Sequence, residues 1–387
     1  MARARAPSER MSDVELVETP AALHALCTEL SAAPMACLDA EGPGHGAYPD
    51  RLCLLVLGVG ARIFVVDPLA VDVSPLAGEL ARPERPLVVH DVAYDARLLA
   101  LAGLPLGCVH DTSVAATMLG RVKTGLASLA EELLGVVVDK SLQASAWGRR
   151  PLEARALDYL AQDAELPVAL YTRLWPELEE RDLVDETLAE TQHRIRKAGE
   201  AVRLGALGGW WKLAFARGLG TQERRWLRSA WSARARVATD RDRSPALLLS
   251  DDELERLVKS VPTSVAELGD RMGRRVRDAP LVEALAAALD GAQVPVPDAE
   301  LAQLDAPVPT SAERERAKRL RKRLVAWRDA EAERRGVGGA AVLPGHLADR
   351  LAGDPGCLRQ GPELLSGMGT RRWQRYGDAL RSILEDR

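Results

Sequence analysis

The sequence predicts an α/β domain followed by two small all-α domains. Over residues 15–190, short apolar runs typical of strands alternate with segments of helical periodicity, a pattern that favours a sheet covered by helices. From about residue 205 onward the strand signals disappear, and helical segments separated by loops take their place. Four prolines in residues 293–309 mark a linker, because proline-rich stretches are extended and do not continue a helix.

Local patterns predict the elements of the first domain. Residues 35–39 and 86–90 are short apolar runs and are predicted strands. Residues 52–57 and 62–66 are apolar or β-branched, and the intervening Gly58-Val59-Gly60 predicts a β-hairpin. Helical periodicity follows at residues 94–102, 112–119 and 125–134. Residues 152–178 predict one long helix that begins after Pro151 and kinks or breaks at Pro167.

The second half is predicted to be helical throughout. Acids in the first turn favour a helix at residues 251–258, another begins at residues 263–268, and helical signals resume at residue 312. Residues 205–289 and 310–387 share a weak pattern that suggests an internal repeat. The expected organisation is a disordered N-terminus at 1–14, the α/β domain at 15–190, helical domains at 205–290 and 310–387, and the linker at 293–309.

Basic residues are concentrated in one region of a chain whose formal net charge is −4. Residues 194–243 contain 13 Lys or Arg and four acids, a local net charge of +9. Such a region is a candidate polyanion-binding surface, and a solvated helical face is the alternative interpretation. The candidate nucleic-acid contacts are Arg224, Arg225, Arg228, Arg371 and Arg372.

The sequence also argues against several protein classes. No uninterrupted apolar run approaches ~20 residues, so we expect no membrane span. The first ten residues lack the apolar segment of a secretory signal. The five cysteines form no Cys-x-x-Cys pair, so neither a zinc site nor a disulfide framework is indicated. We expect a cytoplasmic protein, and no obligate protein partner is inferred.

Four carboxylates and one tyrosine carry the chemical signal. Asp39 and Glu41 are two residues apart, so on a strand both point to one face. Tyr159 and Asp163 are four apart, so on a helix they share a face. Asp95 follows a predicted strand, near the start of a helix. Together the carboxylates could hold two Mg²⁺ or Mn²⁺ ions against a phosphodiester, because both ions prefer oxygen ligands.

Each of these residues alone has an ordinary structural interpretation. Asp39 and Glu41 could form salt bridges, Asp95 could cap a helix, Tyr159 could lie in the core and Asp163 could be a solvated helix acid. A catalytic interpretation depends on their joint order and contexts. In that interpretation Tyr159 orients the attacking water, since a phenol with a reference pKa near 10 is a poor general base.

At this point the chain resembles the DEDD superfamily of exonucleases, and ribonuclease D within it. Leu38-Asp39-Ala40-Glu41 resembles the first motif of that superfamily, and His90 to Asp95 followed by Arg97-Leu98-Leu99 resembles the second. Trp147 to Leu152, leading into Tyr159 and Asp163, resembles the third motif in its tyrosine version. The resemblance covers roughly residues 15–180. It implies a ribonuclease H-like fold, two divalent metal ions and 3′–5′ exonuclease activity, with Asp39, Glu41, Asp95, Tyr159 and Asp163 as site residues.

The two helical segments resemble HRDC domains, which are small modules found after the exonuclease in ribonuclease D. The best match is residues 362–369, Pro-Glu-Leu-Leu-Ser-Gly-Met-Gly, with Arg375-Tyr376-Gly377. The chain departs from the family at Gly42-Pro43-Gly44, where an aromatic residue or threonine is common, and at Val56, where glutamine is common. Because these positions lie near the 3′-terminal nucleotide in the family, the departures are expected to affect substrate binding or catalytic efficiency.

Three hypotheses follow. The leading one is a metal-dependent 3′–5′ exoribonuclease that acts on RNA 3′ ends such as those of transfer RNA precursors and releases nucleoside 5′-monophosphates. A second keeps the chemistry but uses single-stranded DNA, since the 2′-hydroxyl takes no part in the reaction. A third is a catalytically weak nucleic-acid-binding adaptor, for which Gly42-Pro43-Gly44 is the main support.

Overall fold

The computed structural model describes residues 13–44, 46–143, 145–206, 209–273, 278–291, 294–305 and 307–385. The chain divides into two compact units. The first contains Met1–Gly42, Leu52–Gly199 and Pro309–Arg387, and the second contains Pro43–Arg51 and Glu200–Val308. The predicted disordered N-terminus lies outside the described residues up to position 12, and a strand already begins at Asp13.

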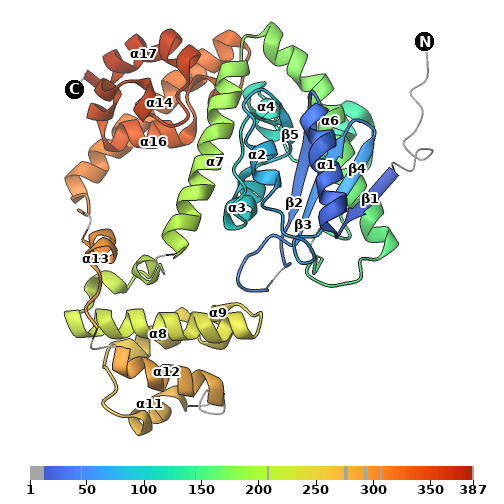
Figure 1. Cartoon of the computed structure of the whole chain (residues 1–387). Helices are drawn as coiled ribbons and strands as arrows, with labels where there is room; N and C mark the ends of the chain where they lie inside the picture. The colour runs from blue at the N-terminus through green and yellow to red at the C-terminus, as the bar shows by residue number, and fades with distance from the viewer. Residues whose placement is uncertain are drawn as a thin grey trace. The chain divides into compact units, whose positions relative to one another are not determined.

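The described residues of the first unit contain one six-stranded mixed sheet (Figure 1). In sheet order its strands are β1 (Asp13–Val17), β4 (Arg62–Val66), β3 (Leu54–Val59), β2 (Ala36–Glu41), β5 (Leu87–Val89) and β6 (Val109–Asp111). The predicted hairpin is confirmed, because β3 and β4 are antiparallel. Strand β2 is antiparallel to β3 and parallel to β5. Strand β2 pairs with β3 along its whole length and with β5 at Ala36 and Cys37.

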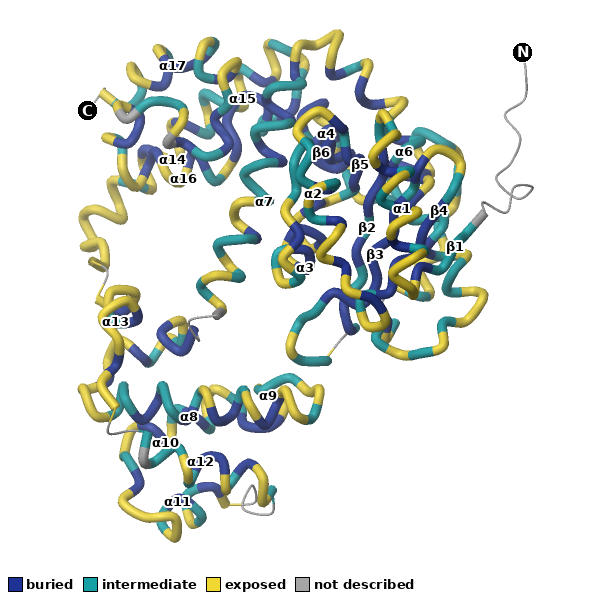
Figure 2. Tube along the Cα trace, viewed as in Figure 1, coloured by how far each residue is buried: buried dark blue, intermediate teal, exposed yellow. Residues whose placement is uncertain are grey.

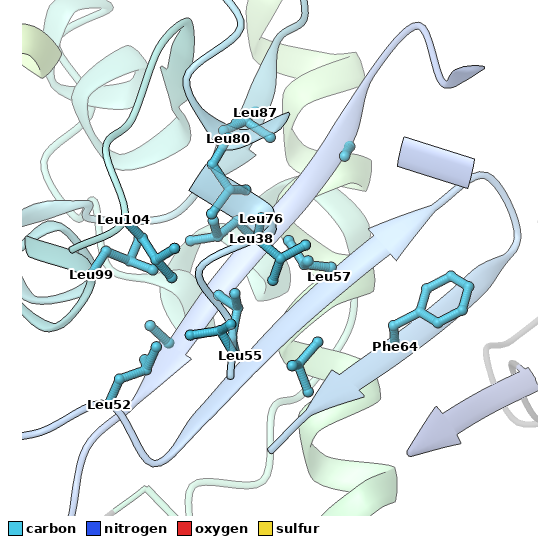
Figure 3. Close-up of a cluster of buried hydrophobic side chains, with 14 of the residues drawn as sticks. Leu38, Leu52, Leu55, Leu57, Phe64, Leu76, Leu80, Leu87, Leu99 and Leu104 are labelled. Atoms are coloured by element: carbon cyan, nitrogen blue, oxygen red, sulfur yellow. The ribbon is translucent and has the colours of Figure 1, made fainter. Parts of the chain in front are cut away.

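Helices cover both faces of this sheet. Helices α1 (Pro20–Ala32), α2 (Leu76–Leu80) and α3 (Ala93–Leu101) share one apolar core with the sheet, whose leucines are drawn in Figure 3. Helix α6 (Ala154–Glu180) packs on the other face through Leu160 and Ala164. Helices α4 (Thr112–Met118) and α5 (Leu126–Leu129), with the turn Ala130–Leu134, pack beside α6. Helix α6 continues without a break through Pro167.

The C-terminal segment forms a helical subdomain within the first unit. Helices α14 (Ser311–Arg335), α15 (Gly339–Val342), α16 (Gly345–Gly353) and α17 (Thr370–Glu385) enclose their own apolar core, visible as buried segments in Figure 2. Helix α7 (Val184–Ala206) contacts this subdomain, because the rings of His193 and His346 are stacked with centroids 3.6 Å apart. The backbone N–H of Gly338 also donates to the carbonyl of Met118 at 2.8 Å.

The second unit is helical. It contains α8 (Thr221–Asp240), α9 (Pro245–Leu248), α10 (Asp251–Val258), α11 (Val265–Met272), α12 (Ala279–Gly291) and α13 (Asp298–Leu304), with short 3₁₀ turns at Trp210–Lys212 and Ala216–Gly218. Trp210 and Trp226 are almost fully buried in its core. Residues 43–51 belong to this unit, where the guanidinium of Arg51 pairs with Asp242 at 2.9 Å.

The predicted linker at 293–309 is wrong in its middle, where α13 forms. Pro297 occupies the N-cap with φ −59°, and acids in the first turn favour a helix start. The buried Glu300 then accepts hydrogen bonds from Trp210 and Arg228, which ties α13 to the rest of the unit. The sequence analysis also missed β1, β6 and α1, which are short or carry little periodic signal. Among the described residues, no helix is both long and apolar enough for a membrane span.

Arg372 is predicted to be a major stabilising residue of the C-terminal subdomain. Its side chain is fully buried and donates to the carbonyls of Ala341, Ala340, Met368 and Gly367. We expect Arg372→Met to lower the free energy of unfolding by about 3 kcal/mol, because several buried acceptors lose their donor. Chemical denaturation measures this, with the exposed neighbour Arg371→Met as the control; equal stabilities of the two variants would contradict the assignment.

The histidine stack predicts acid sensitivity. Burial and the neighbouring His346 lower the pKa of His193 from 6.5 to about 4, with Lys197 and Arg196 acting in the same direction and Glu190 opposing them. Between these pH values the unfolded chain binds the proton more readily, so stability falls as the pH falls from 6.5 towards 4. We expect His193→Gln to flatten this part of the profile of melting temperature against pH. An unchanged slope would show that His193 contributes nothing to it.

Candidate active site

Strand β2 places two acids on the side of the sheet that faces α6. Leu38 and Ala40 lie in the core beneath α1, α2 and α3, whereas Cys37 lies in the core shared with α6. Because side chains alternate along a strand, Asp39 and Glu41 share the face of Cys37. The predicted pairing of the two acids on one face is therefore found in the structure.

Helix α6 brings the tyrosine and a third acid to the same place. Leu160 and Ala164 anchor the helix in the core, and Tyr159 and Asp163 precede them by one position each. The Tyr159 hydroxyl donates a hydrogen bond to the Asp163 carboxylate. Carboxylate oxygens of Asp39, Glu41 and Asp163 all lie within 4.8 Å of one another. Such a spacing is suitable for a shared cation.

Asp95 joins this group from α3. It lies in the first turn of the helix and is 5% exposed. The negative charges of Asp39 and Glu41 both act on it, and the Ala40 backbone N–H stabilises the ionised forms of Asp39 and Asp95. All four predicted acids are thus brought into one electrostatically coupled cluster, with Asp95 outside the trio whose oxygens lie within 4.8 Å.

Burial raises every pKa in the cluster, and repulsion from neighbouring carboxylates adds to the rise for Asp39, Glu41 and Asp95. Burial, followed by the charge of Asp163, raises the pKa of Asp39 to about 7. Burial and the charges of Asp39 and Asp163 raise the pKa of Glu41 to about 9. Burial raises the pKa of Asp163 to about 6 and that of Asp95 well above 3.8. Bound cations would favour the ionised form of the whole cluster at neutral pH, because a positive charge lowers the pKa of a neighbouring carboxyl group.

Tyr159 remains protonated in this setting. Burial, followed by the charge of Asp163, raises the pKa of its phenol well above the ordinary 10. Its ring lies against the buried ring of Trp147, with centroids 5.8 Å apart and planes 30° apart. Tyr159 is therefore oriented as a hydrogen-bond donor, and a phenol with so high a pKa is a poor general base at neutral pH.

Gly42 lies close to side chains of α3, a neighbourhood that the sequence did not reveal. A Cβ atom at this position would lie 2.1 Å from the hydroxyl oxygen of Tyr94 and 3.6 Å from the Leu98 side chain. A larger residue after Glu41 would therefore require the exposed Tyr94 side chain to move.

The five candidate nucleic-acid contacts have different environments. Arg372 is fully buried, so its predicted contact with nucleic acid is wrong. Arg228 is bonded to Glu300, and Arg224 donates to the carbonyl of Arg217 and lies 3.6 Å from Asp305. Arg225 is partly buried. Arg371 is exposed, with its Nε 3.8 Å from Asp182.

Known proteins are similar to this chain in sequence and in fold. A family model described as a 3′-5′ exonuclease matches residues 14–179. Ribonuclease D of Escherichia coli (strain K12) is 28% identical over 67% of this chain and 69% of its own length. Ribonuclease D of Zymomonas mobilis is 30% identical over 50% of this chain and 56% of its own length. The chain is therefore similar in sequence to ribonuclease D over about two thirds of its length.

The fold is similar as well. The crystal structure of Escherichia coli ribonuclease D matches with a TM-score of 0.73 at 24% identity, covering 97% of this chain and 99% of that one. The structural match supports a ribonuclease H-like catalytic fold. The exonuclease model and the ribonuclease D relatives indicate that the chain is a hydrolytic 3′–5′ exoribonuclease. Its cofactors are two divalent metal ions, and the carboxylate oxygens of the cluster are the ligands that such ions prefer.

The repulsion within the cluster predicts a trade-off between stability and activity. With metal ions removed, we expect Asp39→Asn to raise the melting temperature by on the order of a few degrees, because one charge is lost. The sign follows from the raised pKa: above about pH 4 the unfolded chain ionises Asp39 more readily than the folded one does. Mn²⁺ should stabilise the parent protein more than the variant.

Differential scanning fluorimetry with chelator and with Mn²⁺ measures both effects. Asp158→Asn is the matched control, because Asp158 lies on α6 beside Tyr159 but is exposed. A parent protein whose melting temperature is the same in chelator and in Mn²⁺ would contradict the cation-binding role of the cluster.

Proposed function

We propose that this ribonuclease D homologue trims the 3′ ends of structured RNA in the cytoplasm, transfer RNA precursors included. The observation that carries this proposal is the carboxylate trio Asp39, Glu41 and Asp163, within 4.8 Å beside a protonated tyrosine. The Escherichia coli enzyme of similar fold is described as an exoribonuclease involved in structured RNA processing. Removal of one nucleotide at a time would release nucleoside 5′-monophosphates.

In this proposal Asp39, Glu41, Asp95 and Asp163 are the metal ligands. Two divalent ions, when bound, supply an activated water and stabilise the leaving 3′ oxygen. The protein contributes position and charge, because phosphoryl transfer needs little covalent help. Tyr159 holds the attacking water through its hydroxyl, and Asp163 fixes the orientation of that hydroxyl by accepting its hydrogen bond. The ring of Trp147 restricts Tyr159 from the side.

We further propose that residues 205–290 and 310–387 are HRDC-like modules, and that the second one contacts RNA phosphates. Helix α14 has an exposed basic surface, formed by Arg316, Lys318, Arg319 and Lys322. Arg371 on α17 is exposed as well. Arginine and lysine side chains that neutralise phosphates release counterions, so the affinity should fall steeply as the salt concentration rises. This surface replaces the buried Arg372 in the proposed RNA contact.

A time course on a 3′-extended transfer RNA labelled at its 5′ end tests the function. We expect a ladder that shortens from the 3′ end with Mg²⁺ or Mn²⁺ and stops with chelator. Asp39→Asn and Asp163→Asn should each lower the rate by about 100-fold or more, since an interaction needed in the transition state is lost. Asp158→Asn should retain the parent rate.

The same assay separates the alternatives. A DNA oligomer of matched sequence shortened faster than the RNA would make single-stranded DNA the better substrate. Full activity in Asp39→Asn or Asp163→Asn would refute the proposed metal site. Salt-sensitive RNA binding without any metal-dependent shortening would favour the adaptor.

A further inference from the structure

The turn that leads into Asp95 is held in an unfavourable conformation. Asp91 has φ +63°, in the left-handed region that non-glycine residues rarely adopt. Val92, the N-cap of α3, has no side-chain capping bond. A strained residue before an uncapped helix persists only when neighbouring groups over-determine it. The position of Asp95, three residues into α3, therefore depends on what holds residues 90–92, in addition to the packing of Ala96, Leu98 and Leu99 in the core.

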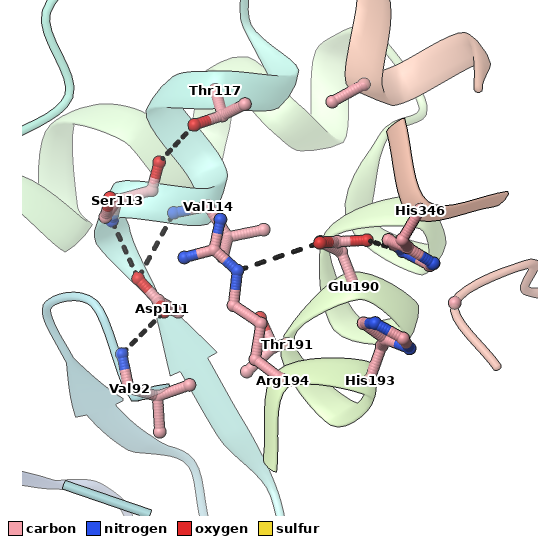
Figure 4. A network of polar contacts seen from close by, with 12 residues as sticks. Val92, Asp111, Ser113, Val114, Thr117, Glu190, Thr191, His193, Arg194 and His346 are labelled. Atoms are coloured by element: carbon pink, nitrogen blue, oxygen red, sulfur yellow. Dashed lines mark hydrogen bonds and ion pairs between the residues drawn. The ribbon is translucent and has the colours of Figure 1, made fainter. Parts of the chain in front are cut away.

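One set of restraints comes from inside the domain (Figure 4). The buried carboxylate of Asp111 accepts the backbone N–H group of Val92 at 2.9 Å, as Figure 4 shows. It also accepts the backbone N–H group of Asp91 at 3.0 Å. The same carboxylate caps α4 by accepting the N–H groups of Ser113 and Val114. Asp111 therefore joins the turn to the start of α4 through its backbone, but leaves the Asp91 side chain unrestrained.

A second restraint comes from α7. The guanidinium of Arg194 donates to the Asp91 carboxylate at 3.0 Å through Nη1, and its Nε lies 3.7 Å from Glu190. Glu190 in turn contacts His346 of the C-terminal subdomain at 2.9 Å, as Figure 4 shows. Glu190 is 8% exposed, so the Arg194 side chain is oriented by a partly enclosed partner. The contacts run without a gap from α16 through α7 to the turn before Asp95.

We propose that Arg194 is a positioning residue for the exonuclease reaction. It clamps the Asp91 side chain and thereby fixes the start of α3, on which Asp95 meets the metal ions. The contact of His346 with Glu190 helps to orient Glu190, and Glu190 in turn orients the Arg194 side chain. In this way the C-terminal subdomain contributes to the position of Asp95. This inference rests on the proposed metal-holding role of Asp95.

Two variants weaken the clamp without disturbing the backbone. Arg194→Met removes the charge but keeps the length of the side chain. Asp91→Asn removes the partner charge, and asparagine tolerates the left-handed conformation. We expect each to lower kcat on a short RNA by about tenfold with little change in KM, since small misplacements near a reacting centre have such effects. Mn²⁺ binding without RNA, measured by calorimetry, should weaken by a similar factor.

The double variant and a matched control make the test specific. Arg194→Met with Asp91→Asn should be no worse than either single variant, because both remove one interaction. Arg196→Met removes the same charge from the same helix, where Arg196 contacts Ser366 instead of the turn, and should keep the parent kcat and Mn²⁺ affinity. Arg194→Met indistinguishable from Arg196→Met would overturn the inference. So would a rise in KM alone, or a lower melting temperature with normal Mn²⁺ binding.

Asp95→Asn separates this inference from the proposed function. If that variant keeps full activity and Mn²⁺ binding, the role of Asp95 fails and the role of Arg194 fails with it. If Asp95→Asn loses both while Arg194→Met loses neither, the metal site stands and the clamp alone is refuted.

Discussion

The mutual repulsion of the clustered carboxylates is the constraint on which this fold depends. Two unit charges ~4 Å apart repel by about 4 kcal/mol at an effective dielectric constant of 20. Asp39, Glu41 and Asp163 lie at such separations, and the raised pKa values record the cost. The backbones that carry them must therefore be fixed by contacts made elsewhere. Strand β2 meets this need because it pairs with β3 along its whole length, and its first two residues, Ala36 and Cys37, also pair with β5.

On helix α6, core packing holds the site residues in place. Leu160 and Ala164 are inserted in the core, and each follows a functional residue by one position. One step along a helix is a rotation of about 100°, so burial of the apolar pair sets the direction of Tyr159 and Asp163. Asp95 lies on the shorter helix α3, which packs in the core through Leu98 and Leu99. The start of this helix is further held by the turn at residues 90–92, through Asp111 and Arg194.

The sequence could predict the parts of the site in which residues two or four positions apart share one face of a strand or helix. A two-residue spacing places Asp39 and Glu41 on one strand face, and a four-residue spacing does the same for Tyr159 and Asp163 on a helix. The space beside Gly42 could not be predicted, because Tyr94 comes from a distant element. The turn before Asp95 is equally non-local, since Arg194 is 103 positions from Asp91. Spacing determines which residues share a face, whereas tertiary packing determines what that face meets.

The basic region at residues 194–243 shows the same limit for charged residues, because the sequence does not show which tertiary contacts their side chains make. Its density of arginines predicted a polyanion surface, but several of these side chains serve the protein itself. Arg234 is 2% exposed and pairs with Asp251, Arg228 pairs with Glu300, and Arg241 pairs with Asp278. An arginine that already satisfies a carboxylate must break that contact before it can bind a phosphate. Local net charge therefore overestimates nucleic-acid affinity wherever guanidinium groups form ion pairs within the protein. The exposure of basic side chains is the better guide to the RNA-binding surface.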